Sequence, residues 1–183
     1  MNIPKDHIME GIVSTFRTYG YEGASLSKLS TVTGLGRSSL YHYFPDGKVD
    51  MARAAFIHLT TQFESQVLNP LTDTQLTPNE RLDYCKQGLQ HFYTEGYQPC
   101  LLNIFSMGQA SEALRLPIRE FTLKVKHRLA VFMTGIGLAE SEAERRSEAL
   151  LIELQGTLVL TRALNDSAVF QRFLDKLPTQ LLG

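Results

Sequence analysis

The chain has 183 residues, a net charge of −1 and a hydrophobic fraction of 43%, which is enough to form a sizeable core. This length fits either one compact body or a small domain followed by a larger one. A charge balance so close to zero excludes a protein that coats nucleic acid by general attraction to phosphates. The sequence holds no run of about 18 apolar residues and begins without a charged-then-apolar signal pattern, so we expect a cytoplasmic protein without a membrane span.

Leucine is abundant and strand-like alternation is absent, which predicts an all-α fold. The first helix is expected over residues 5–19, because Ile8, Ile12 and Phe16 recur at every fourth position and form one apolar face. Gly20 is expected to end this helix.

A helix-turn-helix pattern follows the first helix. Ser25 is a suitable N-cap for a second short helix. The sequence Gly34-Leu35-Gly36 then predicts a tight turn, since Gly34 can adopt a positive φ. A third short helix runs into an aromatic cluster before Pro45. The pattern indicates a unit that places its last helix in the major groove of DNA, and the alternative is a three-helix packing unit with a solvated outer face.

The predicted outer face of the third helix carries residue types that suit the major groove. Arg37 can contact guanine or a phosphate, and Ser38 and Ser39 are small enough to allow close approach. Tyr41 can donate to a phosphate or touch a thymine methyl group. A solvated face without this role would favour Glu and Lys. The predicted DNA-contacting residues are Ser25, Ser27, Lys28, Arg37, Ser38, Ser39, Tyr41, His42, Tyr43 and Lys48.

The segment from Phe16 to Lys48 resembles the N-terminal DNA-binding domain of TetR-family transcriptional regulators. The residues that carry the resemblance are Phe16-Arg-Thr-Tyr-Gly-Tyr21, then Ser25, then Gly34-Leu-Gly-Arg-Ser-Ser-Leu-Tyr-His-Tyr-Phe44, and finally Lys48. The resemblance implies a homodimer joined by its last two long helices, with a pocket for an inducer in the C-terminal domain.

The segment departs from the family pattern at two points. Gly36 stands where the family usually has a Ser or Thr cap for the recognition helix. An extra residue in Pro45-Asp-Gly-Lys48 shifts the lysine relative to the common pattern. Farther along the chain, residues 155–164 resemble the subgroup of multidrug-efflux repressors.

The rest of the chain is predicted to be helical, with a loop over residues 69–79. The expected helices cover residues 48–68, 78–96, 101–107, 117–136, 140–164 and 167–177. We therefore expect a three-helix helix-turn-helix DNA-binding domain over residues 1–47 and a helical ligand-binding and dimerisation domain over residues 48–183.

The predicted helix over residues 140–164 is apolar on two sides. One apolar stripe consists of Leu150, Leu154 and Leu158, and another of Ile152, Gly156, Val159 and Ala163. A helix with two apolar sides needs two packing partners. We expect one partner to be the same helix of a second subunit, and the alternative is burial of both sides within one chain. The predicted dimer-interface residues are Leu150, Leu154, Gly156, Leu158 and Val159.

Large, adaptable side chains supply candidate walls for the implied pocket, and their number favours a hydrophobic ligand. The alternative for each of them is an ordinary place in the core or on the surface. The candidate ligand-binding residues are Phe63, Tyr84, Phe92, Tyr93, Asn103, Phe105, Met107, Phe132 and Gln155.

The two cysteines are assigned separately. Cys85 aligns with Leu82 and Leu89 on a predicted helix, which indicates core packing. Cys100 follows Pro99 at a predicted helix start, where a thiolate is favoured. One alternative function is therefore a regulator that senses oxidants or electrophiles through Cys100.

Motifs of catalysis and metal binding are absent from the sequence. It contains no His-Glu-x-x-His, no Cys-x-x-Cys, no Gly-x-Ser-x-Gly and no phosphate loop, so we expect no enzyme, metal or cofactor. The predicted function is that of a dimeric, sequence-specific regulator, a repressor released from a palindromic DNA operator by a small hydrophobic inducer. A second alternative is a helical protein that binds a small molecule and has no DNA-binding role.

Overall fold

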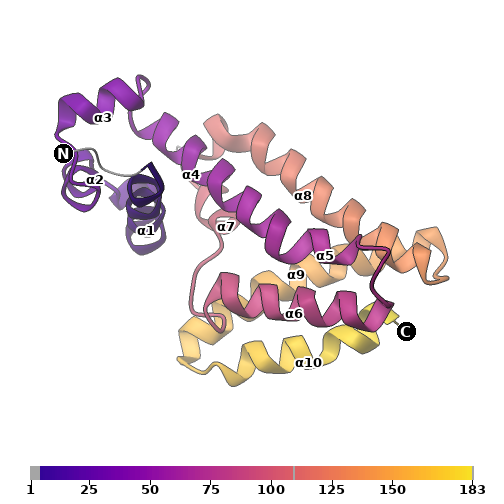
Figure 1. Ribbon diagram of the computed structural model, residues 1–183. Coiled ribbons are helices and arrows are strands. Elements are labelled where there is room, and N and C mark those ends of the chain that lie inside the picture. Colours follow the sequence, from indigo (N-terminus) through magenta and orange to yellow (C-terminus); the bar gives the residue numbers. More distant parts are fainter. Residues whose placement is uncertain (1–4, 109, 183) are drawn as a thin grey trace. The chain divides into compact units, whose positions relative to one another are not determined.

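In the computed structural model, which describes residues 5–108 and 110–182, every regular element of those residues is a helix (Figure 1). This confirms the predicted all-α fold. The chain divides into two compact units, each with far more contacts within itself than with the other. Unit 1 combines Met1–Thr61 with Leu101–Ile118, and unit 2 combines Gln62–Cys100 with Arg119–Gly183. Within the described residues, no helix is long and apolar enough to cross a membrane.

Unit 1 is built around an aromatic core. Its elements are α1 (Lys5–Gly23), α2 (Leu26–Thr33), α3 (Arg37–Tyr43), most of α4 (Lys48–Phe63), α7 (Leu101–Phe105) and the start of α8 (Ala110–Gly135). The ring of Phe16 stacks on Tyr21 with centroids 6.0 Å apart, and Phe105 meets Phe16 edge-on at 5.2 Å. Since Phe16 and Phe105 are fully buried, the segment that begins at α7 is part of the core beneath α1.

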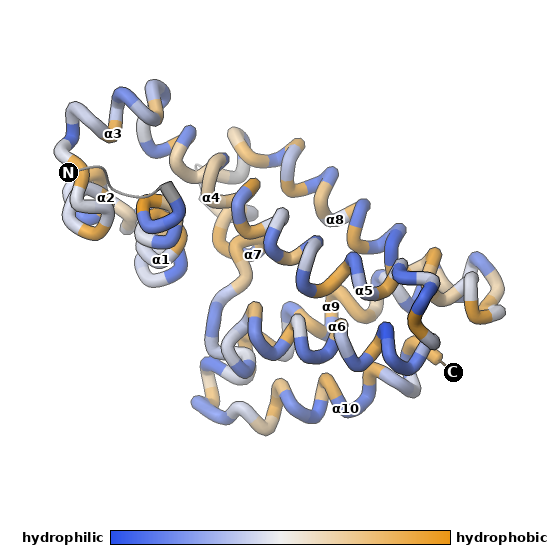
Figure 2. Tube along the Cα trace, in the orientation of Figure 1, coloured by the Kyte–Doolittle hydropathy of each residue, from blue (hydrophilic) through white to orange (hydrophobic). Residues whose placement is uncertain are grey.

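Unit 2 is a bundle of longer helices. It contains the end of α4, the π-helical segment η1 (Glu64–Leu68), α5 (Asn69–Leu71), α6 (Pro78–Tyr93), the rest of α8, α9 (Glu140–Leu164) and α10 (Ala168–Leu182). In Figure 1, α10 runs beside α6 and α9, and the contacts of α10 agree. Hydrophobic positions recur along α10 at each turn (Figure 2), and they bury Phe170, Phe173, Leu174, Leu177 and Leu181.

The division by packing differs from the predicted boundary after residue 47. α4 crosses from unit 1 to unit 2 after Thr61, and residues 101–118 return to unit 1. A boundary drawn along the chain cannot anticipate this return, because it depends on the contact between Phe105 and a ring of α1. The assignment of DNA binding to residues 1–47 and of ligand binding and dimerisation to 48–183 stays a prediction.

Two helices are longer than predicted because they continue through a proline. α8 begins at Ala110, not at residue 117, and contains Pro117 in its interior. α10 continues past Pro178 to Leu182. A proline inside a helix removes one backbone hydrogen bond and normally favours a helix end. By contrast, the helix predicted over residues 140–164 has the same bounds as α9.

The backbones of η1 and α6 approach each other so closely that no Cβ atom would fit between them. A Cβ atom built on Gly88 of α6 would lie 2.8 Å from the carbonyl carbon of Gln66 and closer still to the carbonyl oxygen. Real Cβ contacts of this kind do not occur with backbone atoms. Glycine at position 88 is therefore what permits α6 to rest directly on the backbone of η1.

We expect Gly88→Ala to destabilise the protein, because the new methyl group must push α6 and η1 apart. Overpacking of this kind costs about 1–3 kcal/mol, which corresponds to a fall of several degrees in the midpoint of thermal unfolding. Gly135→Ala is the matched control, since a Cβ there meets no atom within 4 Å. An equal midpoint for the two variants would contradict the close contact.

Candidate DNA-binding site

The helix-turn-helix is held by local hydrogen bonds at the ends of its helices. The Ser25 hydroxyl caps α2 by accepting from the backbone N–H of Lys28 at 3.3 Å. α2 ends at Gly34, whose φ of 69° is left-handed, as the turn requires. Ser30 donates from its hydroxyl to the Leu35 carbonyl at 2.6 Å and fixes the turn. Gly36 caps α3 without any side-chain hydrogen bond, as its missing side chain dictates.

Buried leucines beneath the two short helices leave the polar side chains outside. Leu29 of α2 and Leu40 of α3 are fully buried. Ser25, Ser27, Lys28, Arg37, Ser38, Ser39, Tyr41, His42 and Tyr43 are all exposed, whereas Lys48 is half-buried. Every predicted residue of α3 is therefore accessible, and only Leu40 of this helix is buried. Whether these side chains contact DNA stays a prediction.

Tyr41 is positioned by the loop that follows α3. Gly47 has a φ of 63°, and a Cβ at this position would lie 3.2 Å from Cε1 of Tyr41. The phenol ring thus rests against the glycine, while the side chain remains 47% exposed. This packing limits the freedom of a residue predicted to touch the major groove.

The two lysines predicted to contact DNA also have partners inside unit 1. The Lys28 ammonium donates to the Gly23 carbonyl at 3.0 Å and lies 3.8 Å above the Tyr19 ring. The Lys48 ammonium donates to the Tyr21 carbonyl at 3.0 Å and lies 4.4 Å above the Tyr21 ring. An ammonium has three donors, so each lysine retains donors for a phosphate. Sequence analysis missed these internal roles, because they join residues of different helices.

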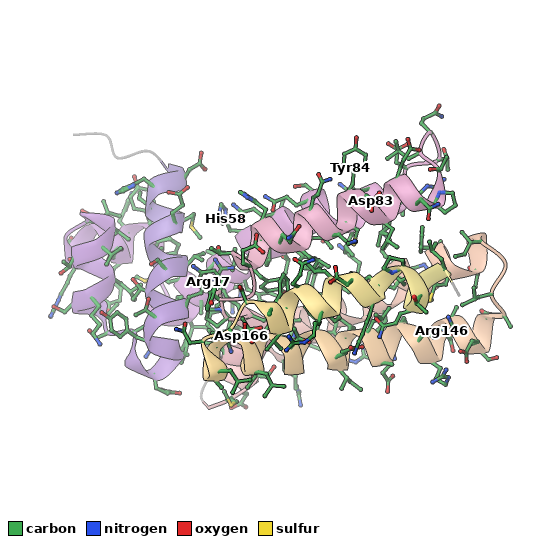
Figure 3. All side chains as sticks on the ribbon, turned by 90° about the horizontal axis from the view of Figure 1, so that it is seen from below. Arg17, His58, Asp83, Tyr84, Arg146 and Asp166 are labelled. Carbon is green, nitrogen blue, oxygen red and sulfur yellow. The ribbon has the colours of Figure 1, made fainter. Side chains whose placement is uncertain are left out.

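Four of the predicted ligand-binding residues lie in unit 1 or on the exposed side of α6. Asn103, Phe105 and Met107 belong to unit 1, where Phe105 is part of the aromatic core and Met107 is 62% exposed. Tyr84 of α6 is 50% exposed and points away from the helices of unit 2 (Figure 3). Whether these four residues contact a ligand stays a prediction, since helical periodicity alone does not tell which helix a face will meet.

The remaining predicted ligand residues lie in unit 2, with the aromatic ones near its core. The ring of Phe63 contacts other aromatic rings: it meets Phe92 edge-on with ring centroids 5.2 Å apart and Tyr93 with centroids 6.3 Å apart. Phe132 is buried, and Gln155 is half-buried. Phe63 alone of the predicted set lines the cavity described next.

Unit 2 contains a small, partly open apolar cavity of about 40 Å³. Its walls come from α4, η1, α6, α8, α9 and α10, and they consist of Phe63, Val67, Leu68, Cys85, Leu89, Val125, Leu129, Leu150, Leu151, Leu154, Phe173, Leu177 and Leu181. Burial raises the pKa of the Cys85 thiol to about 12. The thiol is therefore protonated at neutral pH and serves as a small apolar wall, in keeping with its predicted packing role.

Three of the predicted dimer-interface residues face inwards. Leu150, Leu154 and Leu158 are 5%, 5% and 1% exposed, so their own subunit already covers them and they cannot meet a partner. Gly156 and Val159, from the same predicted set, lie on the exposed side of α9. One of the two apolar sides predicted for this helix therefore faces the core of its own chain, and whether the other side meets a second subunit stays a prediction.

Cys100 is buried at 7% exposure, and the Tyr93 hydroxyl donates to its Sγ at 3.5 Å. Burial of this kind restricts access of an oxidant to the thiol. The helix that follows, α7, is a single five-residue turn. Among the described residues, no group of His, Cys, Asp and Glu side chains is arranged to hold a metal ion.

The fold and the exposed face of α3 define a class of protein, a helix-turn-helix DNA-binding protein with a second helical unit. Residues 8–55 match the family model described as "Bacterial regulatory proteins, tetR family". The chain is a TetR-family transcriptional regulator with an N-terminal helix-turn-helix domain. This confirms the resemblance drawn from the sequence. Regulators of this family are not enzymes.

Relatives with curated names extend over almost the whole chain. An uncharacterized HTH-type transcriptional regulator in the lacX 3' region of Lactococcus lactis subsp. lactis is 21% identical over 96% of this chain and 91% of its own length. The uncharacterized HTH-type transcriptional regulator YxaF of Bacillus subtilis (strain 168) is 23% identical over 95% of this chain and 93% of its own length.

Solved structures share the complete fold at low sequence identity. A TetR transcriptional regulator from Legionella pneumophila has a TM-score of 0.84 and 16% identity, with 99% of this chain and 100% of that chain covered. The regulatory protein TetR from Rhodobacter sphaeroides has a TM-score of 0.83 and 16% identity, with 98% and 99% covered. The likeness confirms the arrangement of helices.

Lys48→Ala is expected to lower the thermal stability of the free protein, because the ammonium holds the Tyr21 carbonyl. The loss of such a hydrogen bond from a charged donor costs about 1.5–3 kcal/mol, less for a half-exposed group. Lys176→Ala is the control, since its ion pair with Glu153 is long at 4.0 Å and exposed. An unchanged unfolding midpoint in Lys48→Ala would mean that Lys48 does not stabilise the free protein and that its only role is in DNA binding.

Arg37→Ala and Tyr41→Ala are each expected to weaken specific DNA binding by about 1–3 kcal/mol if these side chains contact bases. The measurement is a fluorescence titration with both operator and random DNA. A loss that is equal on the two DNAs would instead assign the side chain to a phosphate.

Proposed function

We propose that this regulator is a cytoplasmic homodimer that represses transcription from a palindromic operator and is released by a small hydrophobic ligand bound in unit 2. The observation that carries the proposal is the exposed surface of α3, where Arg37, Ser38, Ser39 and Tyr41 are accessible next to the turn that begins at Gly34. Such a face combines a guanidinium with hydroxyl donors, which suits base edges and phosphates in the major groove.

The charge of the DNA-binding segment supports a dimer. Within residues 1–45, the basic residues are Lys5, Arg17, Lys28 and Arg37, and the acidic residues are Asp6, Glu10 and Glu22. Attraction to phosphates adds with each contact, so one subunit with so small an excess of positive charge binds DNA weakly. Two copies on one palindrome double the contacts and place their recognition helices about 34 Å apart.

The exposed side of α9 is the proposed dimer interface. Ile152 is 67% exposed, Val159 is 43% exposed and Leu160 is 52% exposed. Gly156 lies among them, and a Cβ there would meet no atom within 4 Å of its own subunit. Large apolar side chains contiguous on a helix are rarely left to water in a monomer. The missing side chain at Gly156 allows a second helix to come close.

α4 provides the proposed route from ligand to DNA. It begins at Lys48, which contacts Tyr21 beside the helix-turn-helix, and ends at Phe63, which lines the cavity of unit 2. A ligand that prefers a different position of α4 shifts the population away from the DNA-binding state. A coupling of about 1–3 kcal/mol would weaken DNA binding roughly 5–150-fold.

Ile152→Lys tests the dimer, because two lysines would face each other in the interface. We expect the variant to sediment as a monomer and to lose specific operator binding, while its circular dichroism stays helical. Tyr84→Lys is the matched control, as it places the same charge at a residue that is 50% exposed on α6. An Ile152→Lys protein that remains dimeric and binds its operator normally would refute the interface.

A further inference from the structure

Gly47 is a buried residue in the turn between α3 and α4. The two residues before it in this turn, Pro45 and Asp46, are both exposed. A Cβ atom built on Gly47 would lie 3.2 Å from Cε1 of Tyr41 and 3.9 Å from both Cζ and the hydroxyl oxygen. The edge of the phenol ring next to the hydroxyl group therefore lies on the glycine. Any side chain at position 47 would push the ring away from this place.

Tyr41 is held differently from the other aromatic residues of α3. The rings of His42 and Tyr43 contact each other with centroids 5.8 Å apart, and Tyr43 also contacts Phe44. Within the part of the chain that the structure describes, no hydrogen bond, ion pair or ring contact holds the Tyr41 side chain. Packing on Gly47 therefore limits the rotation of this ring.

The backbone of Gly47 joins the recognition helix to α4. Its N–H donates at 2.8 Å to the carbonyl of Phe44, the residue that caps α3. Its carbonyl accepts from the N–H of Met51 in α4 at 3.1 Å. Its φ of 63° is left-handed, a conformation that glycine adopts without strain. The surface on which Tyr41 rests is therefore bonded to both helices.

Asp50, in the first turn of α4, holds the same turn. Its Oδ2 accepts from the backbone N–H of Asp46 at 2.8 Å, and its Oδ1 pairs with the guanidinium of Arg53 at 2.7 Å. Binding to phosphates depends on positive charge, so a carboxylate bonded to the turn after α3 opposes DNA binding by its charge. The bond to Asp46 gives Asp50 a structural role that acts in the opposite direction.

From these contacts we infer that Gly47 is a positioning residue for specific DNA binding, which holds the Tyr41 ring in place for operator bases while Asp50 holds the turn. The inference rests on the proposed function, in which Tyr41 touches the major groove. A side chain that is ordered before binding loses less conformational freedom on DNA, which favours affinity by about 2–12-fold. Since Gly47 stands at the start of α4, a movement of α4 reaches the Tyr41 ring through one residue.

Gly47→Ala and Gly47→Asn separate displacement of the ring from backbone strain. Asparagine tolerates a left-handed φ better than alanine does, but its side chain is larger. Strain alone would make alanine the more harmful substitution, whereas displacement of Tyr41 makes asparagine the more harmful one. We expect each variant to lower operator affinity by about 2–12-fold, with the larger loss for asparagine, and to leave the affinity for random DNA unchanged. The reverse order, or an equal loss on random DNA, would overturn the inference.

A double-mutant cycle tests whether Gly47 acts through Tyr41. In the Tyr41→Ala background, Gly47→Asn is expected to change operator affinity by less than about twofold, because the ring that it displaces is absent. A loss as large as in the wild-type background would contradict a role through Tyr41.

Asp50→Ala gives a test in which the two explanations differ in sign. Removal of the negative charge alone would strengthen binding to operator and to random DNA alike. Loss of the bond to Asp46 should instead weaken binding to the operator and not to random DNA. Stronger binding to both DNAs would show that Asp50 does not help to position Tyr41.

Fluorine NMR of the free protein tests the ring contact without DNA. The seven tyrosines are replaced by 3-fluorotyrosine, and the Tyr41 signal is the one that Tyr41→Phe removes. We expect Gly47→Asn to shift this signal. Gly137→Ala is the control and should leave the signal in place, since Gly137 also has a left-handed φ, of 104°, but a Cβ there meets no atom within 4 Å. An unshifted Tyr41 signal in a folded Gly47→Asn protein would overturn the inference.

The same set of variants separates this inference from the proposed function. If circular dichroism shows that Gly47→Asn does not fold, the NMR signal is measured in Gly47→Ala and Asp50→Ala. If the Tyr41 signal shifts but Tyr41→Ala binds the operator normally, Gly47 positions the ring and the proposed contact of Tyr41 with bases fails. If Tyr41→Ala loses operator affinity but the signal does not shift, the contact with DNA stands and the role of Gly47 fails.

Discussion

The edge-on contact between Phe105 and Phe16, at 5.2 Å, determines how this chain is organised. Phe16 belongs to the first helix, and Phe105 lies in a short helix some ninety residues later along the chain. Because both rings are fully buried, α7 packs on α1, and the segment from Leu101 to Ile118 belongs to the same compact unit as the helix-turn-helix. The DNA-binding unit is thus completed by a segment from the second half of the chain.

This return means that the two units are joined by several covalent connections. The chain passes between them after Thr61, after Cys100 and after Ile118. The first and the last of these connections lie inside continuous helices, α4 and α8, and Pro117 stands next to the last. A helical connection transmits movement better than a flexible linker does. The topology therefore supports the proposed route from unit 2 through α4 to the helix-turn-helix.

The two sites rely on opposite chemistry. The face of α3 is exposed and rich in hydroxyl groups, with Arg37 as its cation, so it suits a hydrated polyanion. The cavity of unit 2 is apolar, and none of the side chains that line it carries a charge.

Sequence reasoning predicted local features well and long-range packing poorly. The turn at Gly34, the Ser25 cap and the bounds of α9 depend on nearby residues, and the structure agrees with each. The outward direction of Tyr84 and the burial of Leu158 depend on which helix lies alongside, which periodicity alone does not determine. The hydrogen bond from the Lys48 ammonium to the Tyr21 carbonyl joins two helices that are distant in sequence. Nothing in the helix-turn-helix motif indicates this bond.

Specific DNA binding by a dimer is the central claim of this account. The direct measurement is a competition titration with DNA that flanks the protein's own gene, at about 150 mM salt with excess random DNA, because salt governs the unspecific component. The account predicts tight, specific binding of two subunits and protection of a palindrome. Binding no tighter than to random DNA, found also in a genome-wide selection of target sites, would contradict it.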